Sequence, residues 1–226
     1  MKIFDRIPQC LAVLGATTAL IGLAGCSILG GGGVAYPARY TLDAGPADTA
    51  ARATTSSTGY TLDLRPVGAP GWLDSNRMLY RLDSGDNPQI SAYTQSAWAD
   101  TPARLVGDNL KDTLSGSGLF AAVLGEAPGQ ADLALQLELS DFSQRFASST
   151  VSHGHIAATA TLLAADSGAV IAQKRFETMA GAPTADAAGG VDALAAADAR
   201  LNREIRQWLA TTLAQCGKAC PEAGTE

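Results

Sequence analysis

Short stretches of alternating apolar and polar residues occur along the first half of the chain, and this period of two is typical of β-strands. Residues 36–43 and 60–67 each show it and are predicted to be strands, whereas the small and polar residues between them are typical of a loop. Residues 78–82 and 89–93 flank the sequence DSGDNP, which is rich in turn-forming residues. This arrangement predicts a hairpin, so the sheet is expected to begin antiparallel.

The second half of the chain carries the strongest strand pattern. Residues 131–142 have the sequence ADLALQLELSDF, with leucine at every second position from 133 to 139, and they predict a strand with one buried face. Residues 156–163 and 169–176 flank AADSG and predict a second hairpin.

Two segments change to the helical period of 3.6 residues. The first begins at Pro102, with Asp100 or Thr101 as its N-terminal cap, and ends near the glycines at 116 and 118. The second is predicted over residues 191–214, and its apolar stripe comprises Val191, Leu194, Leu201, Ile205, Trp208, Leu209 and Leu213. The order of elements predicts an α+β fold, a two-layer domain with two helices packed on one face of a mainly antiparallel sheet.

The N-terminal segment has the features of a secretory signal. Lys2 and Arg6 precede residues 11–23, which carry no charge but are too few to span a bilayer, for which about 20 apolar residues are needed. The residues Leu23-Ala24-Gly25-Cys26 resemble the bacterial lipobox, in which the cysteine thiol accepts a diacylglyceryl group and becomes the first residue of the mature chain. The alternative is an ordinary secreted protein in which Cys26 is a free or paired thiol.

Lipid attachment at Cys26 would hold the protein on a membrane, since buried acyl chains contribute about 0.8 kcal/mol per CH₂ group. Ser27 stands where many enterobacterial lipoproteins retained in the inner membrane have aspartate, and this resemblance to a sorting rule predicts an outer-membrane protein facing the periplasm. The expected organisation is a signal peptide over residues 1–25, an acylated cysteine and flexible glycine-rich tether over 26–35, one domain over 36–214 and a tail over 215–226.

The charge of the chain narrows the range of partners. It has 16 basic and 22 acidic residues, a formal net charge of −6, and removal of residues 1–25 leaves 14 basic and 21 acidic residues, a net charge of −7. An acidic surface without a basic stripe argues against binding to nucleic acid and against electrostatic docking on anionic lipid. Membrane attachment is therefore assigned to the acyl chains.

The mature chain would keep two further cysteines, Cys216 and Cys220, close to its C-terminal end. The oxidising periplasm favours a local disulfide between them. The alternative is a metal site that also uses His153 and His155, but nothing in the sequence brings the two segments together. We therefore predict a disulfide and no metal site, with the two histidines at the exposed end of a strand.

Familiar catalytic and cofactor motifs are absent from the sequence, including GxGxxG, a Walker loop, GxSxG, HExxH and paired CxxC. Ser152 and His153 do not make a nucleophile and base, because neighbouring residues of a strand point to opposite faces. No enzymatic activity and no cofactor are predicted. Trp72 is a candidate for a partner-facing surface, with packing at a strand start as the alternative, whereas Trp98 and Trp208 are predicted core residues.

Three segments in succession resemble the ABC-type transport auxiliary lipoprotein family, which includes the paraquat-inducible protein C group. They are RYTLD, LDLRPVGAPGWLDSNRMLYRLD and ISAYTQSAWADTPARLVGDNLKDTLSGSGLFAAV. The lipobox and the final helix LNREIRQWLATTL add to the match, which extends over residues 36–213. The resemblance implies a periplasm-facing outer-membrane lipoprotein that works with MCE-domain proteins and with an ABC permease and ATPase, which move lipids between two membranes.

The leading functional hypothesis is a non-enzymatic docking or conduit subunit of such a transporter, either monomeric or homo-oligomeric. One alternative is an outer-membrane lipoprotein that assembles or plugs a β-barrel. The other is a periplasmic hydrolase, which a polar cleft holding His153 or His155 with a carboxylate would favour.

Overall fold

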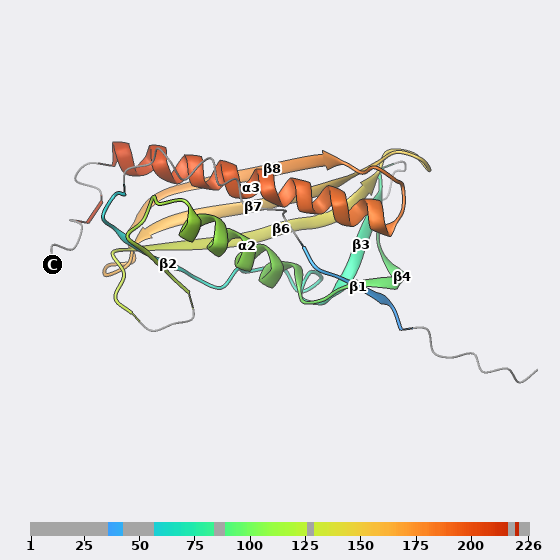
Figure 1. Cartoon of the computed structure of the whole chain (residues 1–226), viewed down its shortest axis with the longest axis horizontal. Coiled ribbons are helices and arrows are strands. Elements are labelled where there is room, and N and C mark those ends of the chain that lie inside the picture. The colour runs from blue at the N-terminus through green and yellow to red at the C-terminus, as the bar shows by residue number, and fades with distance from the viewer. Residues whose placement is uncertain (1–35, 43–56, 84–88, 126–128, 217–219, 222–226) are drawn as a thin grey trace, which may run out of the picture. The chain divides into compact units, whose positions relative to one another are not determined.

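The computed structural model describes residues 36–42, 57–83, 89–125, 129–216 and 220–221. The chain divides into two units, and the unit from Pro37 to Glu226 contains every helix and strand described here. In chain order (Figure 1) these are β1 (Ala38–Tyr40), β2 (Thr61–Leu64), β3 (Arg77–Leu82), β4 (Ile90–Trp98), α2 (Pro102–Gly116), β5 (Ala122–Leu124), β6 (Leu133–Phe146), β7 (Ser152–Ala164), β8 (Val170–Gly181) and α3 (Ala187–Gln215).

The described strands form one mixed sheet around β6. On one side β6 pairs antiparallel with β7, which pairs antiparallel with β8. On its other side β6 pairs parallel with β2 near its start and parallel with β3 near its end. Strand β4 pairs antiparallel with β3, and the short strands β1 and β5 pair parallel with β4 and β2.

The predicted α+β class and both hairpins are confirmed, but the prediction of a mainly antiparallel sheet is wrong. Four of the seven strand pairs are parallel. The parallel pairs join segments far apart in the sequence, such as Leu62 with Leu133, and the alternation within each strand contains no information about such partners.

A bulge in β6 exchanges the two faces of the strand. Leu139 lies opposite Ala158 and Asp141 lies opposite Ala157, so Ser140 is an extra residue in β6. Leucines 133, 135, 137 and 139 are buried before the bulge. After it, Phe142 faces the helices, whereas Asp141 lies on the opposite face of the sheet.

The helix α2 begins as its sequence predicts. Pro102 is its first residue, and the Oγ1 of Thr101 accepts a hydrogen bond from the N–H of Arg104 at 3.4 Å. Its buried stripe consists of Val106, Leu110 and Leu114. Helix α3 starts at Ala187, earlier than predicted, because the carboxylate of Asp186 caps it by accepting from the N–H of Gly189 at 2.8 Å.

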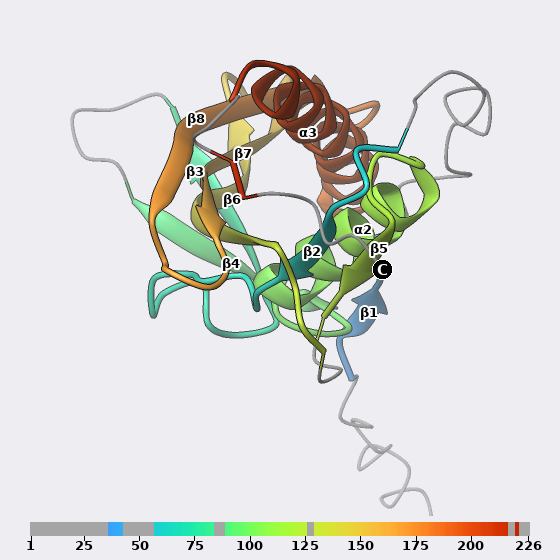
Figure 2. The same cartoon turned by 90° about the vertical axis from the view of Figure 1, so that its left-hand side faces the viewer.

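Helix α3 packs on β7 and β8, and both helices lie on the same side of the central strands (Figure 2). Trp98 is fully buried and its ring meets Phe142 edge-on, so its predicted place in the core is confirmed. Trp208 is only partly buried and packs edge-on against Phe176 at the rim of the core. None of the described helices has both the length and the apolar character that a bilayer crossing requires.

A buried carboxyl group joins the two helices. The Oδ2 of Asp198 in α3 accepts hydrogen bonds from Asn109 of α2 at 2.7 Å and from Asn202 at 3.2 Å. Burial raises the pKa of Asp198 to about 7, although the two amide hydrogen bonds oppose the rise. The same carboxyl has a pKa of 3.8 in the unfolded chain. The free energy of unfolding should therefore fall as the pH rises from 3.8 to about 7.

We expect the contact between β7 and α3 to be intolerant of added volume. A Cβ atom at Gly154 would lie 2.5 Å from the backbone nitrogen of Leu194, whereas one at Gly181 would meet nothing within 4 Å. Gly154→Ala should therefore lower the free energy of unfolding by about 1–3 kcal/mol, as overpacking does. The matched control Gly181→Ala should change it by less than about 0.5 kcal/mol. Equal unfolding midpoints in urea for the two variants would contradict this packing.

Candidate docking surface

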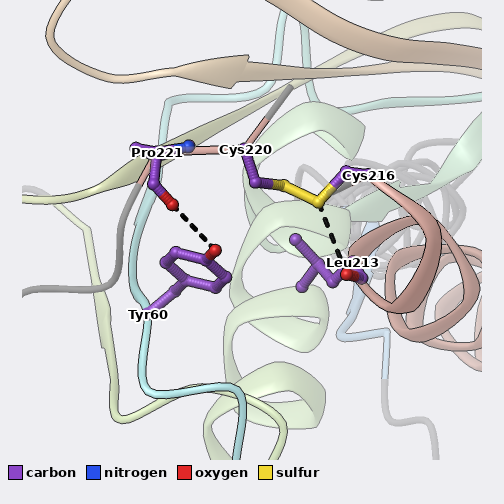
Figure 3. Close-up of a disulfide and its surroundings, with 5 residues drawn as sticks. All are labelled: Tyr60, Leu213, Cys216, Cys220 and Pro221. Carbon is purple, nitrogen blue, oxygen red and sulfur yellow. Dashed lines mark hydrogen bonds between the residues drawn. A yellow bond between two sulfur atoms is a disulfide. The ribbon is translucent and has the colours of Figure 1, made fainter. Parts of the chain in front are cut away.

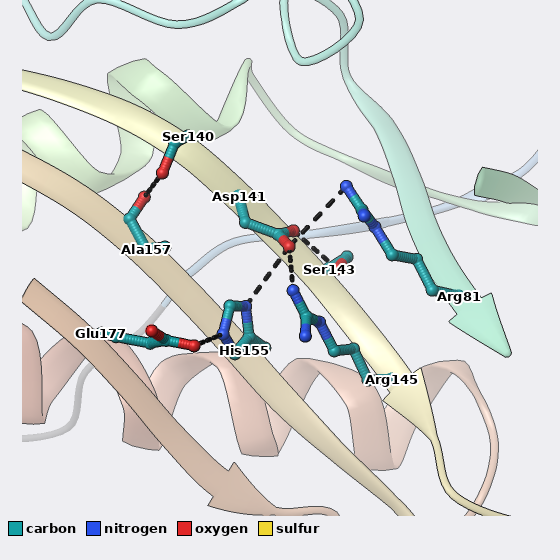
Figure 4. A network of polar contacts seen from close by, with 8 residues as sticks. All are labelled: Arg81, Ser140, Asp141, Ser143, Arg145, His155, Ala157 and Glu177. Carbon is teal, nitrogen blue, oxygen red and sulfur yellow. Dashed lines mark hydrogen bonds and ion pairs between the residues drawn. The ribbon is translucent and has the colours of Figure 1, made fainter. Parts of the chain in front are cut away.

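Four strands place charged side chains on the sheet face opposite the helices, where they form one polar network (Figure 4). Its members are Arg81 from β3, Asp141 and Arg145 from β6, His155 from β7 and Glu177 from β8. The bulge in β6 creates this network, because without it Asp141 would face the core.

Asp141 is the buried centre of the network. Its Oδ2 accepts a hydrogen bond from a terminal nitrogen of Arg145 and lies 3.7 Å from a terminal nitrogen of Arg81. Its Oδ1 accepts from the hydroxyl of Ser143 at 2.8 Å. Burial alone would raise the pKa of Asp141, but the nearby imidazole of His155 and the hydrogen bonds from Arg145 and Ser143 outweigh it and hold the pKa well below its ordinary value.

His155 lies between two carboxylates and is only 2% exposed. Its Nε2 is 2.7 Å from Oε1 of Glu177, and its Nδ1 is 3.4 Å from Oδ2 of Asp141, an ion-pair distance without hydrogen-bond geometry. Burial pulls the pKa of His155 down, yet the two carboxylates together leave it above its ordinary value of 6.5. A positive charge on this imidazole is thus favoured by its neighbours.

The expectation that both histidines lie at an exposed strand end is wrong for His155. Strand β7 begins at Ser152, so His155 is inside the ladder, opposite Ser143 of β6 and Met179 of β8. His153 is partly buried, and burial lowers its pKa. Burial of His155 depends on charged residues from three other strands, which the HxH pattern does not reveal.

The network does not have the form of a hydrolytic site. His155 is closed off from solvent, and the hydroxyl of Ser152 accepts a hydrogen bond from the amide of Gln144 at 2.8 Å. Within the described ranges, no group of three or more His, Cys, Asp or Glu side chains could hold a metal ion. The arrangement is a network of charged side chains that links four strands.

Trp72 lies beside this network, on the connection between β2 and β3. It is 37% exposed, and the guanidinium carbon of Arg81 is 5.2 Å from the centre of its ring. The next residue, Leu73, is fully buried and fixes the connection to the core. We call the two stacked side chains the Trp72–Arg81 patch.

Two hollows lie elsewhere on the described surface. One is bounded by the aromatic side chains of Tyr80, Tyr93 and Phe146, and the Tyr93 hydroxyl donates to Oε1 of Gln144 at 2.9 Å. The other lies between β2 and α2, with both basic and acidic side chains in its wall. Neither is lined by Trp72 or His155.

The structure joins Cys216 and Cys220 by a disulfide just beyond α3, with their Cα atoms 5.5 Å apart (Figure 3). The Tyr60 hydroxyl donates to the carbonyl oxygen of Pro221 at 2.8 Å and ties this end of the chain to the start of β2. Gly154, which separates the two histidines, packs against residues 193–194 of α3, roughly 30 Å along the helix from the cysteines at 1.5 Å per residue, so the two pairs cannot share a metal. Cys26 lies outside the described residues.

We expect the network to depend on Asp141 far more than on Glu177. Asp141→Asn would leave two arginines without their buried carboxylate and should lower the free energy of unfolding by about 3–5 kcal/mol. The Glu177 side chain is 54% exposed, so Glu177→Gln should cost less than about 1 kcal/mol. Urea denaturation at neutral pH distinguishes the two.

The pH dependence supplies a second measurement. Because the folded pKa of His155 is raised, its contribution is present below pH 6.5 and is lost as the pH rises through the folded value. Because the pKa of Asp141 is lowered, its contribution is present above pH 3.8 and is lost on acidification. Asp141→Asn and Glu177→Gln should each lower the His155 pKa in an NMR titration. An unchanged His155 pKa in Asp141→Asn would contradict the contact between His155 and Asp141.

Comparison with known proteins agrees with the resemblance seen in the sequence. None of the curated proteins matches the chain. The crystal structure of protein XCC0632 from Xanthomonas campestris is 20% identical, covers 81% of this chain and 98% of its own, and superposes with a TM-score of 0.66. A crystal structure of an uncharacterized protein is 16% identical, with coverage of 77% and 99% and a TM-score of 0.58. At these identities the two structures establish a shared fold alone.

The sequence itself identifies the family. The family model described as ABC-type transport auxiliary lipoprotein component matches residues 40–206, a range that extends from β1 into α3 and includes Trp72 and the whole polar network. The chain therefore belongs to the ABC-type transport auxiliary lipoprotein component family.

Proposed function

We propose that this protein is a non-enzymatic subunit of an ABC-type system that moves lipids between two membranes, and that it docks an MCE-domain protein, as in the paraquat-inducible protein C group. The observation that carries the proposal is the family match over residues 40–206. The family is one of transport auxiliary lipoproteins and is not a known enzyme family. The closed environment of His155 agrees with a role in binding.

Attachment to the membrane is assigned to Cys26. The sequence Leu23-Ala24-Gly25-Cys26 supports acylation, and Ser27 supports delivery to the outer membrane with the domain facing the periplasm. Acyl chains would then supply the anchor, and the described unit would be free to meet the partner.

The surface assigned to docking is the Trp72–Arg81 patch. Tryptophan and arginine are the side chains most enriched among residues that dominate binding energy at interfaces. Here Arg81 is already held by Asp141, and the buried Leu73 fixes the loop that carries Trp72. A partner would therefore lose little free energy in ordering these two side chains.

The anchor is tested at Cys26. Cys26→Ala should abolish incorporation of labelled fatty acid and either release the protein from membranes or leave it unprocessed, because the thiol that accepts the lipid is gone. Metabolic labelling followed by membrane fractionation measures both effects. Label retained by the variant would refute acylation at this residue.

Docking is tested at Trp72. Trp72→Ala should weaken the affinity for the co-expressed MCE-domain protein by about 2 kcal/mol, as loss of an interface anchor does, and leave the thermal midpoint nearly unchanged. Trp98→Ala is the folding control and should lose about 3–5 kcal/mol of stability as a core truncation. Affinity measured on the purified pair and thermal unfolding report the two effects separately. If Trp72→Ala unfolds as readily as Trp98→Ala, Trp72 is a core residue and the docking surface lies elsewhere.

A further inference from the structure

Strand β8 forms one margin of the described sheet (Figure 1). It has 12 residues and pairs with β7 alone, whereas the other marginal strands, β1 and β5, have 3 residues each. A long strand at an edge presents backbone groups that can pair with another strand.

The hydrogen bonds of the β7–β8 hairpin determine which groups face outward. The N–H of Ala182 donates to the carbonyl of Ser152, so these two residues form a hydrogen-bonded pair. In an antiparallel ladder such pairs alternate with pairs whose backbone groups point away from the partner strand. The outward-facing residues of β8 are therefore Gln173, Arg175, Glu177, Met179 and Gly181.

The contact of Arg200 with this edge agrees with that assignment. A terminal nitrogen of Arg200 in α3 donates to the carbonyl oxygen of Met179 at 2.6 Å. In the described part of the chain, no hydrogen bond reaches the outward N–H or C=O groups of Gln173, Arg175 or Glu177. β8 contains no proline, and the irregularity in its pairing lies near its start, opposite Leu162 and Leu163. The segment from Gln173 to Met179 is thus regular, and among its described outward-facing backbone groups the Met179 carbonyl alone has a partner.

The charge around this edge indicates what kind of strand would fit. Lys174, Arg175 and Arg200 are exposed there, in a chain whose formal net charge is −6. Glu177, the acidic side chain of the segment, is held by His155 at 2.7 Å. Two copies of this edge would bring six cations together with two glutamates that His155 already holds, and this excess of positive charge disfavours self-pairing. Acidic side chains on an added strand would instead be attracted by the three cations.

We propose that the edge of β8 from Gln173 to Met179 binds an extended, acidic segment of a partner protein, which adds to the sheet as a further strand. This rests on the proposed function, because the partner is taken to be the MCE-domain protein of the transport system. Free backbone groups at a regular spacing select a peptide strand over a lipid, whose chains offer no matching donors and acceptors.

The outward direction of the Arg175 N–H allows a selective test. Arg175→Pro removes that donor without breaking a bond to β7, and proline is tolerated at such edge positions. Arg175→Ala removes the same charge but keeps the N–H. With full-length acylated protein and co-expressed MCE-domain protein, Arg175→Pro should abolish co-purification. Arg175→Ala should weaken co-purification only several-fold. This difference from the wild type should shrink as added salt screens the charge of Arg175.

Hydrogen exchange on the wild-type complex gives an independent reading. The amides of Arg175 and Glu177 should exchange rapidly in the free protein and become protected when the partner binds. Arg175→Glu, which leaves the backbone intact, should also lose the partner by charge repulsion, and it decides the matter if Arg175→Pro fails to fold.

The outcomes separate the two proposals. If the wild type does not bind the MCE-domain protein, the proposed function fails. If it binds and both Arg175→Pro and Arg175→Glu bind equally well, or the two amides stay unprotected, strand addition at β8 is refuted. Dimers of the wild type that Arg175→Pro disperses would show that a second copy occupies the edge, and would also overturn the assignment to an acidic partner.

Discussion

The bulge at Ser140 is the constraint on which the rest of the described fold depends. Strand β6 is the common partner of β2, β3 and β7, and its pairing passes from β2 to β3 across the segment that contains the bulge. Because of this one extra residue, the leucines that precede the bulge face the core, whereas Asp141, which follows the bulge, faces away from the core. Without that shift, the same sequence would bury Asp141 beneath α3 and expose Phe142.

Moving Asp141 to the outer face does not expose it to water, and the structure offsets its burial with charge. Arg81 and Arg145 lie opposite each other in the parallel β3–β6 pair, an arrangement that would be repulsive without a carboxylate between them. His155 adds a third donor-bearing group and passes the connection to Glu177 on β8. Asp198 is the contrasting case, because amide groups accompany it and burial therefore favours its neutral form.

The elements that could be predicted from the sequence are those whose signals are local. Thr101 and Pro102 mark the start of α2, and the turn residues of AADSG mark the β7–β8 hairpin. The structure confirms both predictions. Parallel pairing could not be predicted, since Leu62 carries no mark of its partner Leu133. The bulge did leave a signal, because Leu139 and Phe142 are both buried but three residues apart, which breaks the period of two.

The candidate site divides in the same way. The position of Trp72 on a connection between strands follows from the turn-forming residues around it, but its stacking on Arg81 depends on the register of β3 against β6. The helices already occupy the inner face so closely that Gly154 has no room for a methyl group. The surfaces proposed for recognition lie instead on the outer face and at the edge of β8, and the Asp141 network connects these two regions. Glu177 belongs both to that network and to the edge. The network that stabilises the fold therefore also holds in place the strand to which a partner strand would be added.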